Sequence, residues 1–122
     1  MTASTNRLGR IGENLAARHL EGLGYDVVAR NWRTSADDVR GEIDIVARHG
    51  GTLVFCEVKS RRGSAGDALA AVHPRKQRQL RRLASLYLTL EAHAAAVRFD
   101  VVAVAWVPGG GPARVTHVPA AF

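Results

Sequence analysis

Apolar residues recur every three or four positions near the start of the chain, over residues 6–23. This spacing places them on one face of an amphipathic helix, and Gly24 follows where a glycine commonly ends one. The same spacing over residues 74–91 predicts a second long helix. A shorter helix is expected over residues 68–72, whereas residues 1–5, which are small and polar, are expected to be disordered.

Strand-like composition accounts for most of the remaining chain. β-Branched and alternating apolar residues predict five strands, over residues 25–33, 42–48, 52–60, 97–107 and 113–118. The fourth is long enough for a central strand, and the fifth is expected at an edge. This order of elements predicts an α/β fold in which a central mixed sheet of about five strands is flanked by α-helices. Residues 1–122 are expected to form a single domain.

A Gly-Gly pair at residues 50–51 predicts a tight hairpin between the second and third strands. A turn centred on this pair sets Asp44 opposite Glu57 and Glu42 opposite Lys59, all four on one face. A slip of one residue would move the first acid to the apolar face, so the register is well specified. The other face is apolar throughout, with Ile43 opposite Val58, Ile45 opposite Cys56, and Ala47 opposite Val54.

Two carboxylates directly opposite each other, as expected for Asp44 and Glu57, destabilise a hairpin unless something compensates their charge. A divalent cation such as Mg²⁺ or Mn²⁺ is one compensator, and Lys59 supplies a further positive charge. The alternative is a solvent-exposed face on which Glu42 pairs with Lys59. The residues beside Glu57 are apolar, which favours a strand buried on both faces with its charges paired or bound to metal.

The overall charge favours a polyanionic partner, because 17 Lys and Arg residues outnumber 11 Asp and Glu residues and leave a net charge of +6. This partner is either a nucleic acid or an acidic membrane surface. The single cysteine, Cys56, excludes a disulfide framework and a cysteine-based zinc site, and its thiol is expected in the core. The sequence has no apolar run of about 20 residues and no signal-peptide pattern, so we expect no membrane insertion and a cytoplasmic location.

Positive charge is concentrated in two places near the expected acidic face. Arg61 and Arg62 follow Lys59 closely, and the second long helix begins with a run of cations that contains no acid. These residues are candidates for contacts with DNA phosphates, although a solvated helix face is the alternative for the second group. Lys76 is expected to come nearest to the acids. The candidates on the helix are Arg75, Lys76, Arg78 and Arg82.

Two sequence blocks resemble the PD-(D/E)XK nuclease signature, namely GEIDIVA at residues 41–47 and VFCEVKSR at residues 54–61. The first block contains Asp44, which corresponds to the first acid of the signature. The second contains the ExK element at residues 57–59. The position before Asp44 is not the proline of the named motif, and the QxxxY element of some nucleases is missing.

The wider chain resembles the YraN family of small bacterial endonuclease-like proteins, which are related in fold to archaeal Holliday junction resolvases. The order of the blocks carries this resemblance, because residues 12–33, 76–88 and 98–102 match in addition to the two blocks above. It implies a restriction-endonuclease-like fold. Because resolvases are two-fold dimers, it also implies a homodimer.

The resemblance further implies roles for individual residues. Asp44 and Glu57, helped by the backbone carbonyl of Val58, would hold Mg²⁺ or Mn²⁺. Lys59 would orient or activate the attacking water. Glu13 matches an additional acid of resolvase-like proteins, which serves as a metal ligand or orients water; apart from the resemblance, it could be an exposed helix residue.

These features together predict a metal-dependent endonuclease that hydrolyses phosphodiester bonds in structured or branched DNA, like a Holliday junction resolvase. The alternatives are a non-catalytic nucleic-acid-binding protein on the same fold and an interaction subunit of a repair complex. The set of two acids and a lysine favours the enzyme, because a binding module does not need it. Asp100 is expected to pair with an arginine rather than to support the site.

Overall fold

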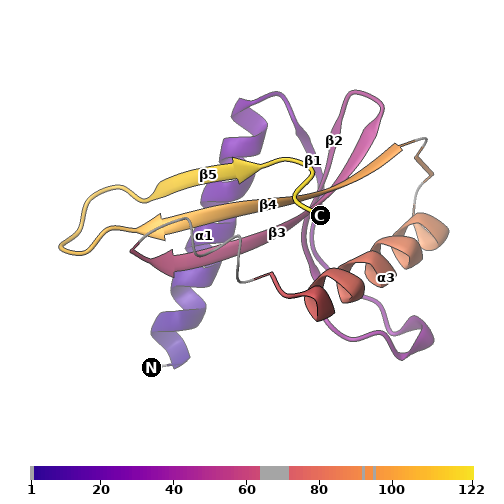
Figure 1. The fold of residues 1–122 in the computed structure, drawn as a ribbon, viewed down its shortest axis with the longest axis horizontal. Coiled ribbons are helices and arrows are strands. Elements are labelled where there is room, and N and C mark those ends of the chain that lie inside the picture. Colours follow the sequence, from indigo (N-terminus) through magenta and orange to yellow (C-terminus); the bar gives the residue numbers. More distant parts are fainter. Residues whose placement is uncertain (1, 64–71, 92, 95) are drawn as a thin grey trace.

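The computed structural model describes residues 2–63, 72–91, 93–94 and 96–122, with side chains from Arg7 onward (Figure 1). The long helices and the strands lie within a few residues of their expected positions. The first helix begins at Thr2, so it takes in most of the segment that was expected to be disordered. The expected helix over residues 68–72 falls almost entirely outside the described residues. In chain order the elements are α1 (Thr2–Gly22), β1 (Asp26–Trp32), η1 (Ala36–Asp38), β2 (Ile43–His49), β3 (Thr52–Arg62), α3 (Pro74–Leu90), β4 (Ala96–Trp106) and β5 (Arg114–Val118).

The strands form one mixed sheet in the order β1-β2-β3-β4-β5. β3 and β4 run parallel on either side of the connection through α3, whereas the other neighbouring pairs are antiparallel. β4 is an interior strand next to the central β3, and β5 lies at an edge as expected. The α/β fold with a five-stranded mixed sheet flanked by helices is therefore confirmed, and it is compatible with a restriction-endonuclease-like fold.

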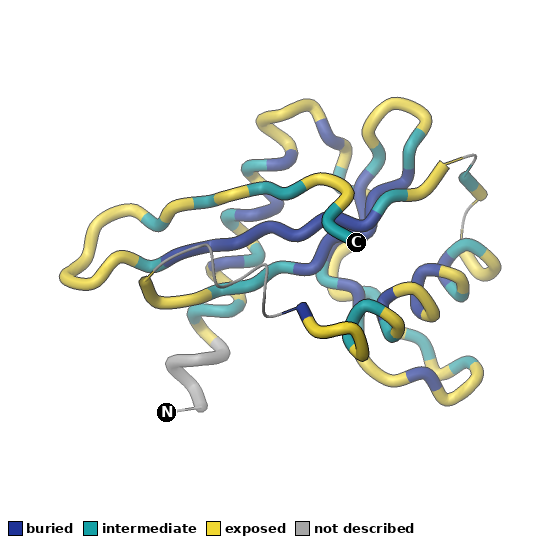
Figure 2. The backbone as a smooth tube through the Cα atoms, in the orientation of Figure 1, coloured by how far each residue is buried: buried dark blue, intermediate teal, exposed yellow. Residues whose placement is uncertain are grey.

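The two helices pack against opposite faces of this sheet (Figure 1). The cluster beneath α1 includes Leu20 of the helix and Val54 and Cys56 of β3, whereas the cluster beneath α3 includes Leu83 of the helix and Phe55 of β3. Because side chains alternate along a strand, β3 contributes to both clusters and is buried on both faces over its middle (Figure 2). Burial raises the pKa of the Cys56 thiol, which fits an inert core residue. No helix in the described part of the chain is long and apolar enough to cross a membrane.

The hairpin between β2 and β3 has the expected register. Ala47 lies opposite Val54 and Ile45 lies opposite Cys56, as the position of the Gly-Gly turn predicts. The ladder ends at this second pair, immediately before the acidic residues. The residues that hold the acids therefore follow directly after the paired residues of the hairpin, but they are not themselves paired in its ladder.

The expected alternation of faces is wrong for Ile43, just beyond the end of this ladder. Its side chain packs in the cluster beneath α3, not with the apolar residues beneath α1. Asp44 supplies the physical reason, because its Oδ2 accepts a hydrogen bond from the backbone N–H of Val58 at 2.8 Å. Where the two strands separate, the side-chain carboxylate of Asp44 thus takes the place of a backbone carbonyl as the acceptor. The alternation of side chains between the two faces of the sheet does not continue beyond this point.

Asp100 pairs with an arginine, as expected, in a buried network on β4. Its carboxylate accepts hydrogen bonds from the guanidinium of Arg98 at 2.8 Å, from His117 Nε2 at 2.6 Å and from the N–H of Ala120 at 3.0 Å. Burial by itself would raise the pKa of Asp100, but these hydrogen bonds outweigh it and hold the pKa below its ordinary value. Arg98 also donates to the Tyr25 hydroxyl at 2.6 Å, so the network joins β4 and β5 to the start of β1.

Candidate active site

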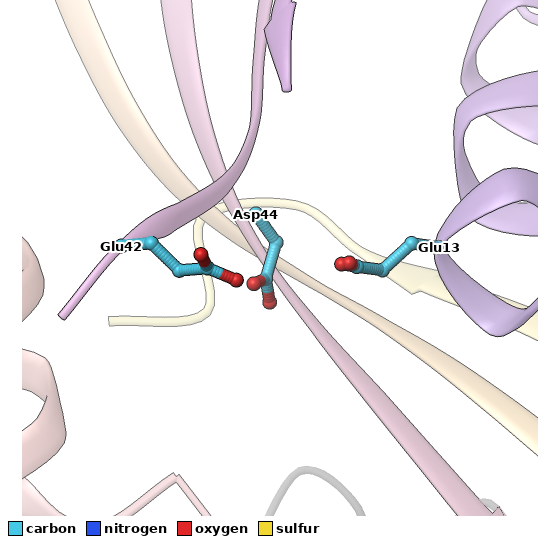
Figure 3. A group of neighbouring side chains, drawn as sticks. All are labelled: Glu13, Glu42 and Asp44. Atoms are coloured by element: carbon cyan, nitrogen blue, oxygen red, sulfur yellow. The ribbon is translucent and has the colours of Figure 1, made fainter. Parts of the chain in front are cut away.

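Three carboxylates, one from α1 and two at the start of β2, converge in the structure (Figure 3). Glu13 comes from α1, Asp44 from β2, and Glu42 from the residue just before β2. One oxygen of each lies within 4.8 Å of the corresponding oxygens of the other two. The structure thus places Glu13 beside Asp44, and it adds Glu42, for which the sequence indicated no clear role.

Asp44 occupies the centre of this acidic group. Burial raises its pKa from 3.8 to about 9, and a hydrogen bond to Glu57 and the charges of Glu57 and Glu13 act in the same direction. The backbone N–H of Val58 opposes this rise. These surroundings favour the protonated form of Asp44 in the absence of metal, whereas a cation bound among these acids would favour the ionised carboxylate.

Glu57 is the second acid of the expected pair, and only 5% of its surface is exposed. Its Oε2 atom is buried without a hydrogen-bond partner, although Lys76 Nζ lies 3.5 Å away. A buried carboxylate oxygen without a hydrogen bond is costly unless a further group compensates it. Glu57, which neighbours Asp44, therefore has a buried oxygen compensated only by the ion pair with Lys76, and such an oxygen suits a cation ligand.

Glu13 and Glu42 are held from the side of β1. Asn31 Nδ2 donates to both oxygens of Glu13, at 2.9 and 3.0 Å, and to Glu42 Oε1 at 3.2 Å. Arg33 contacts the other oxygen of Glu42, with Nε at 2.8 Å and a terminal nitrogen at 2.7 Å from Oε2. Glu42 thus pairs with Arg33 rather than with Lys59, which was the partner expected for a solvated face.

These acids line a cleft with a volume of about 1180 Å³. Lys59 lies in its wall, and so does Ser60 of the same strand. Four arginines also line it, which gives the acidic centre a basic surround. Those arginines are Arg10, Arg33, Arg61 and Arg62.

The basic residues expected to bind DNA divide into two groups in the structure. Arg61 and Arg62 line the cleft. Lys76, at the start of α3, borders the site, because its Nζ lies 3.5 Å from Glu57 Oε2. The remaining α3 candidates are exposed and do not line the cleft; they are Arg75, Arg78 and Arg82.

The sequence interpretation missed three polar residues around the acids. Asn31 and Arg33 lie at and just after the end of β1, and Arg10 lies one turn before Glu13 on α1. Helical spacing alone could have placed Arg10 near Glu13. Asn31 and Arg33 gave no such signal, because their contacts depend on how β1 pairs with β2.

The donor set suits Mg²⁺ or Mn²⁺, which prefer oxygen ligands. Glu13, Glu42 and Asp44 offer carboxylate oxygens within 4.8 Å of one another, and Glu57, which interacts with Asp44, has a buried Oε2 without a hydrogen bond. The participation of the Val58 carbonyl remains a prediction. These residues therefore fit the cation that the sequence predicts.

Comparison with known proteins places this site in a family context. Residues 12–104 match the model of the uncharacterised protein family UPF0102. The chain belongs to this family. The matched segment contains Glu13, Glu42, Asp44, Glu57 and Lys59.

Relatives align over almost the whole chain. A UPF0102 protein of Frankia casuarinae is 48% identical over 94% of this chain and 95% of its own length. A UPF0102 protein of Parafrankia sp. is 50% identical over 97% of this chain and 98% of its own. A UPF0102 protein of Streptomyces coelicolor is 49% identical over 86% of this chain and 81% of its own. The YraN family expected from the sequence blocks, which is UPF0102, is therefore confirmed, and its relation to nucleases stays a prediction.

Proposed function

We propose that the protein is a metal-dependent endonuclease that hydrolyses phosphodiester bonds in structured or branched DNA. The observation that carries this proposal is the pair formed by Asp44 and Glu57, beside Lys59 in a cleft lined by arginines. The buried Oε2 of Glu57 supports a cation at this position, because it accepts no hydrogen bond from the described residues and its ion-pair partner Lys76 Nζ lies 3.5 Å away.

The residues of the site divide the chemistry between them. Asp44, Glu57 and Glu13 would hold Mg²⁺ or Mn²⁺, together with the backbone carbonyl of Val58. The chemistry that such a cation supplies when bound is positive charge at the scissile phosphate and a lower pKa for water. Lys59 Nζ would orient the attacking water and stabilise the negative charge that develops on the phosphoryl oxygens.

The arginines would bind the substrate through its phosphates. Guanidinium groups bind phosphate by two parallel hydrogen bonds, so Arg10, Arg61 and Arg62, which line the cleft, suit the DNA backbone. Contacts to the backbone carry no direct sequence information. This supports recognition of the shape of DNA, as branched substrates require. The homodimer that the resemblance implies remains part of the proposal.

Cleavage assays with purified protein test the proposal. Four-way junction, flap and plasmid DNA are incubated with Mg²⁺ or Mn²⁺, and products are resolved on gels. We expect metal-dependent cleavage that Asp44→Ala and Glu57→Ala each reduce by about 100-fold or more, because even residues that only support metal ligands are worth roughly 10–100-fold. Asp26→Ala is the matched control, because Asp26 is an exposed acid that does not line the cleft.

The same assay separates the proposal from its alternatives. Absence of cleavage on every substrate, or cleavage that survives both site substitutions, contradicts the nuclease. Salt-sensitive DNA binding without cleavage, indifferent to Mg²⁺ and to Lys59→Ala, would instead indicate a non-catalytic binding protein. Absence of both cleavage and DNA binding would favour an interaction subunit.

A further inference from the structure

Asn31 is the one described side chain that hydrogen-bonds two of the converging acids at once. Its amide nitrogen lies 2.9 and 3.0 Å from the oxygens of Glu13 and 3.2 Å from Glu42 Oε1. These acids belong to different parts of the chain, α1 and the residue before β2. A single amide on β1 thus connects the two outer carboxylates of the group shown in Figure 3.

The backbone of Asn31 is unusual at the same point. Its φ is +51°, in the left-handed region, whereas residues of a strand ordinarily have negative φ. Asparagine adopts this conformation more readily than other residues with a side chain, apart from aspartate. A strained backbone persists only where its surroundings hold it, and here the strain coincides with the contact to the acids.

The chemistry of an amide suits this position. Glu13 and Glu42 repel each other, and a donor between them offsets that repulsion and restricts both side chains. A lysine or arginine there would neutralise Glu13 in the way that Arg33 already pairs with Glu42. A neutral amide leaves the charge of Glu13 available, and Glu57, whose buried Oε2 has no hydrogen bond, lines the same cleft.

We infer that Asn31 is a positioning residue that holds Glu13 and Glu42 toward Asp44 and so preassembles the acids for a divalent cation. This inference rests on the proposed metal-dependent function. It predicts that loss of the Asn31 amide weakens cation binding although Asn31 itself is no ligand. Ligands that are already restrained lose less conformational freedom on binding, which is the physical reason for the effect.

The test compares Asn31→Gly with Asn14→Ala. Glycine keeps the left-handed backbone and removes only the amide. Asn14 is a matched control, because its Oδ1 accepts a hydrogen bond from Arg30 at 2.7 Å and so joins the same two elements, α1 and β1, away from the acids. The dissociation constant for Mn²⁺ alone is measured by titration calorimetry, thermal melting reports on stability, and Asp44→Ala identifies the site.

We expect Asn31→Gly to bind Mn²⁺ at least about tenfold more weakly than the wild type, and Asn14→Ala to bind it unchanged. Wild-type affinity in Asn31→Gly would overturn the inference and leave the metal site standing. Equal weakening in Asn14→Ala would also overturn it, because any tie between α1 and β1 would then suffice. A wild type that binds no Mn²⁺, or binds it equally after Asp44→Ala, would overturn the proposed metal site and this inference with it.

Discussion

Asp44 is held in a metal-free arrangement that opposes its own ionisation. Burial and its acidic neighbours raise its pKa to about 9, so the folded protein keeps a proton that the unfolded chain releases near pH 4. Between these two values the folded state binds more protons than the unfolded state. The free energy of unfolding therefore falls as pH rises through this window, and the contribution of Asp44 is fully present only below it.

Asp44→Asn is expected to stabilise the metal-free protein at neutral pH. Asparagine imitates the protonated acid, because its amide donates toward Glu57 while its oxygen still accepts from the N–H of Val58. The gain over the wild type should be near zero at pH 4, about 1 kcal/mol or more at pH 7, and larger still at pH 8. Thermal or urea unfolding without metal at each pH measures it.

In the presence of Mn²⁺ the wild type is expected to be more stable than Asp44→Asn. Mn²⁺ stabilises the wild type by binding its folded state, whereas the variant lacks one of the ligands. Asp26→Asn, an exposed substitution at the start of β1, is the control and should change stability little at any pH. A difference between Asp44→Asn and the wild type that stays constant from pH 4 to pH 8 would contradict the assigned proton.

Individual residues differed in how far the sequence could predict them. Asp44 and Glu57 could be matched because the Gly-Gly turn allows the register to be counted, and Lys59 follows two residues later. The role of Asn31 could not be predicted, because nothing in the local pattern of β1 indicates a left-handed backbone or the side on which α1 packs. Contacts that depend on the packing of distant elements leave no periodic signal in the chain.

At the scale of elements, the contact between α1 and β3 determines where Glu13 lies. A side chain at Gly12 would overlap the hydroxyl of Ser60 on β3, so the helix approaches the strand closely at this position. Glu13 is the next residue along the helix. The distance between helix and sheet therefore sets the distance between Glu13 and the acids of β2 and β3.

Gly12→Ala tests this close approach. Alanine favours a helix by about 1 kcal/mol over glycine, but here its Cβ has no room unless α1 or Ser60 shifts. We expect a net loss of about 1–3 kcal/mol in the free energy of unfolding, with weaker Mn²⁺ binding as Glu13 moves. Chemical unfolding and titration calorimetry measure the two effects.

Gly9→Ala is the matched control on the same helix, because an added Cβ there meets nothing within 4 Å. It should stabilise the protein by about 0.5–1 kcal/mol through helix propensity alone. Ser60→Ala removes the overlapping oxygen and should restore part of the loss in Gly12→Ala. Equal stabilisation by both glycine substitutions would show that α1 is not constrained at Gly12.

The order and type of the two long helices and the five strands followed from the sequence because burial controls their periodicity, whereas the short helix η1 did not. In the hairpin of β2 and β3 the alternation failed where a side chain replaced the backbone ladder, which is why Ile43 was assigned to the wrong face. The beginning of α1 was also placed too late, since its first residues, from Thr2, lack the apolar spacing that marks the rest of the helix. The pattern of apolar and polar residues therefore predicts regular helices and strands well, and it predicts departures from them poorly.

At the scale of the whole molecule, positive charge surrounds the acids on two sides. Arg61 and Arg62 line the cleft at the end of β3, and Lys76 brings the start of α3 next to Glu57. The exposed arginines Arg78 and Arg82 continue along that helix. A DNA backbone that reaches the acids would meet the first group at the cleft, and DNA that extends beyond the cleft would meet the second.

The salt dependence of DNA binding distinguishes such contacts from a general effect of net charge. Each phosphate contact that is lost lowers the slope of log affinity against log salt concentration by about 0.9. We therefore expect the double substitutions Arg61→Ala/Arg62→Ala and Arg78→Ala/Arg82→Ala each to lower the slope by about 2 for a four-way junction. Binding is measured by fluorescence anisotropy at several salt concentrations, in an Asp44→Ala background that prevents cleavage.

The control Arg18→Ala/Arg114→Ala removes the same charge from exposed positions outside the cleft and should leave the slope nearly unchanged. An equal reduction in this control would mean that DNA responds to the total charge of +6 and not to a surface arranged around the acids.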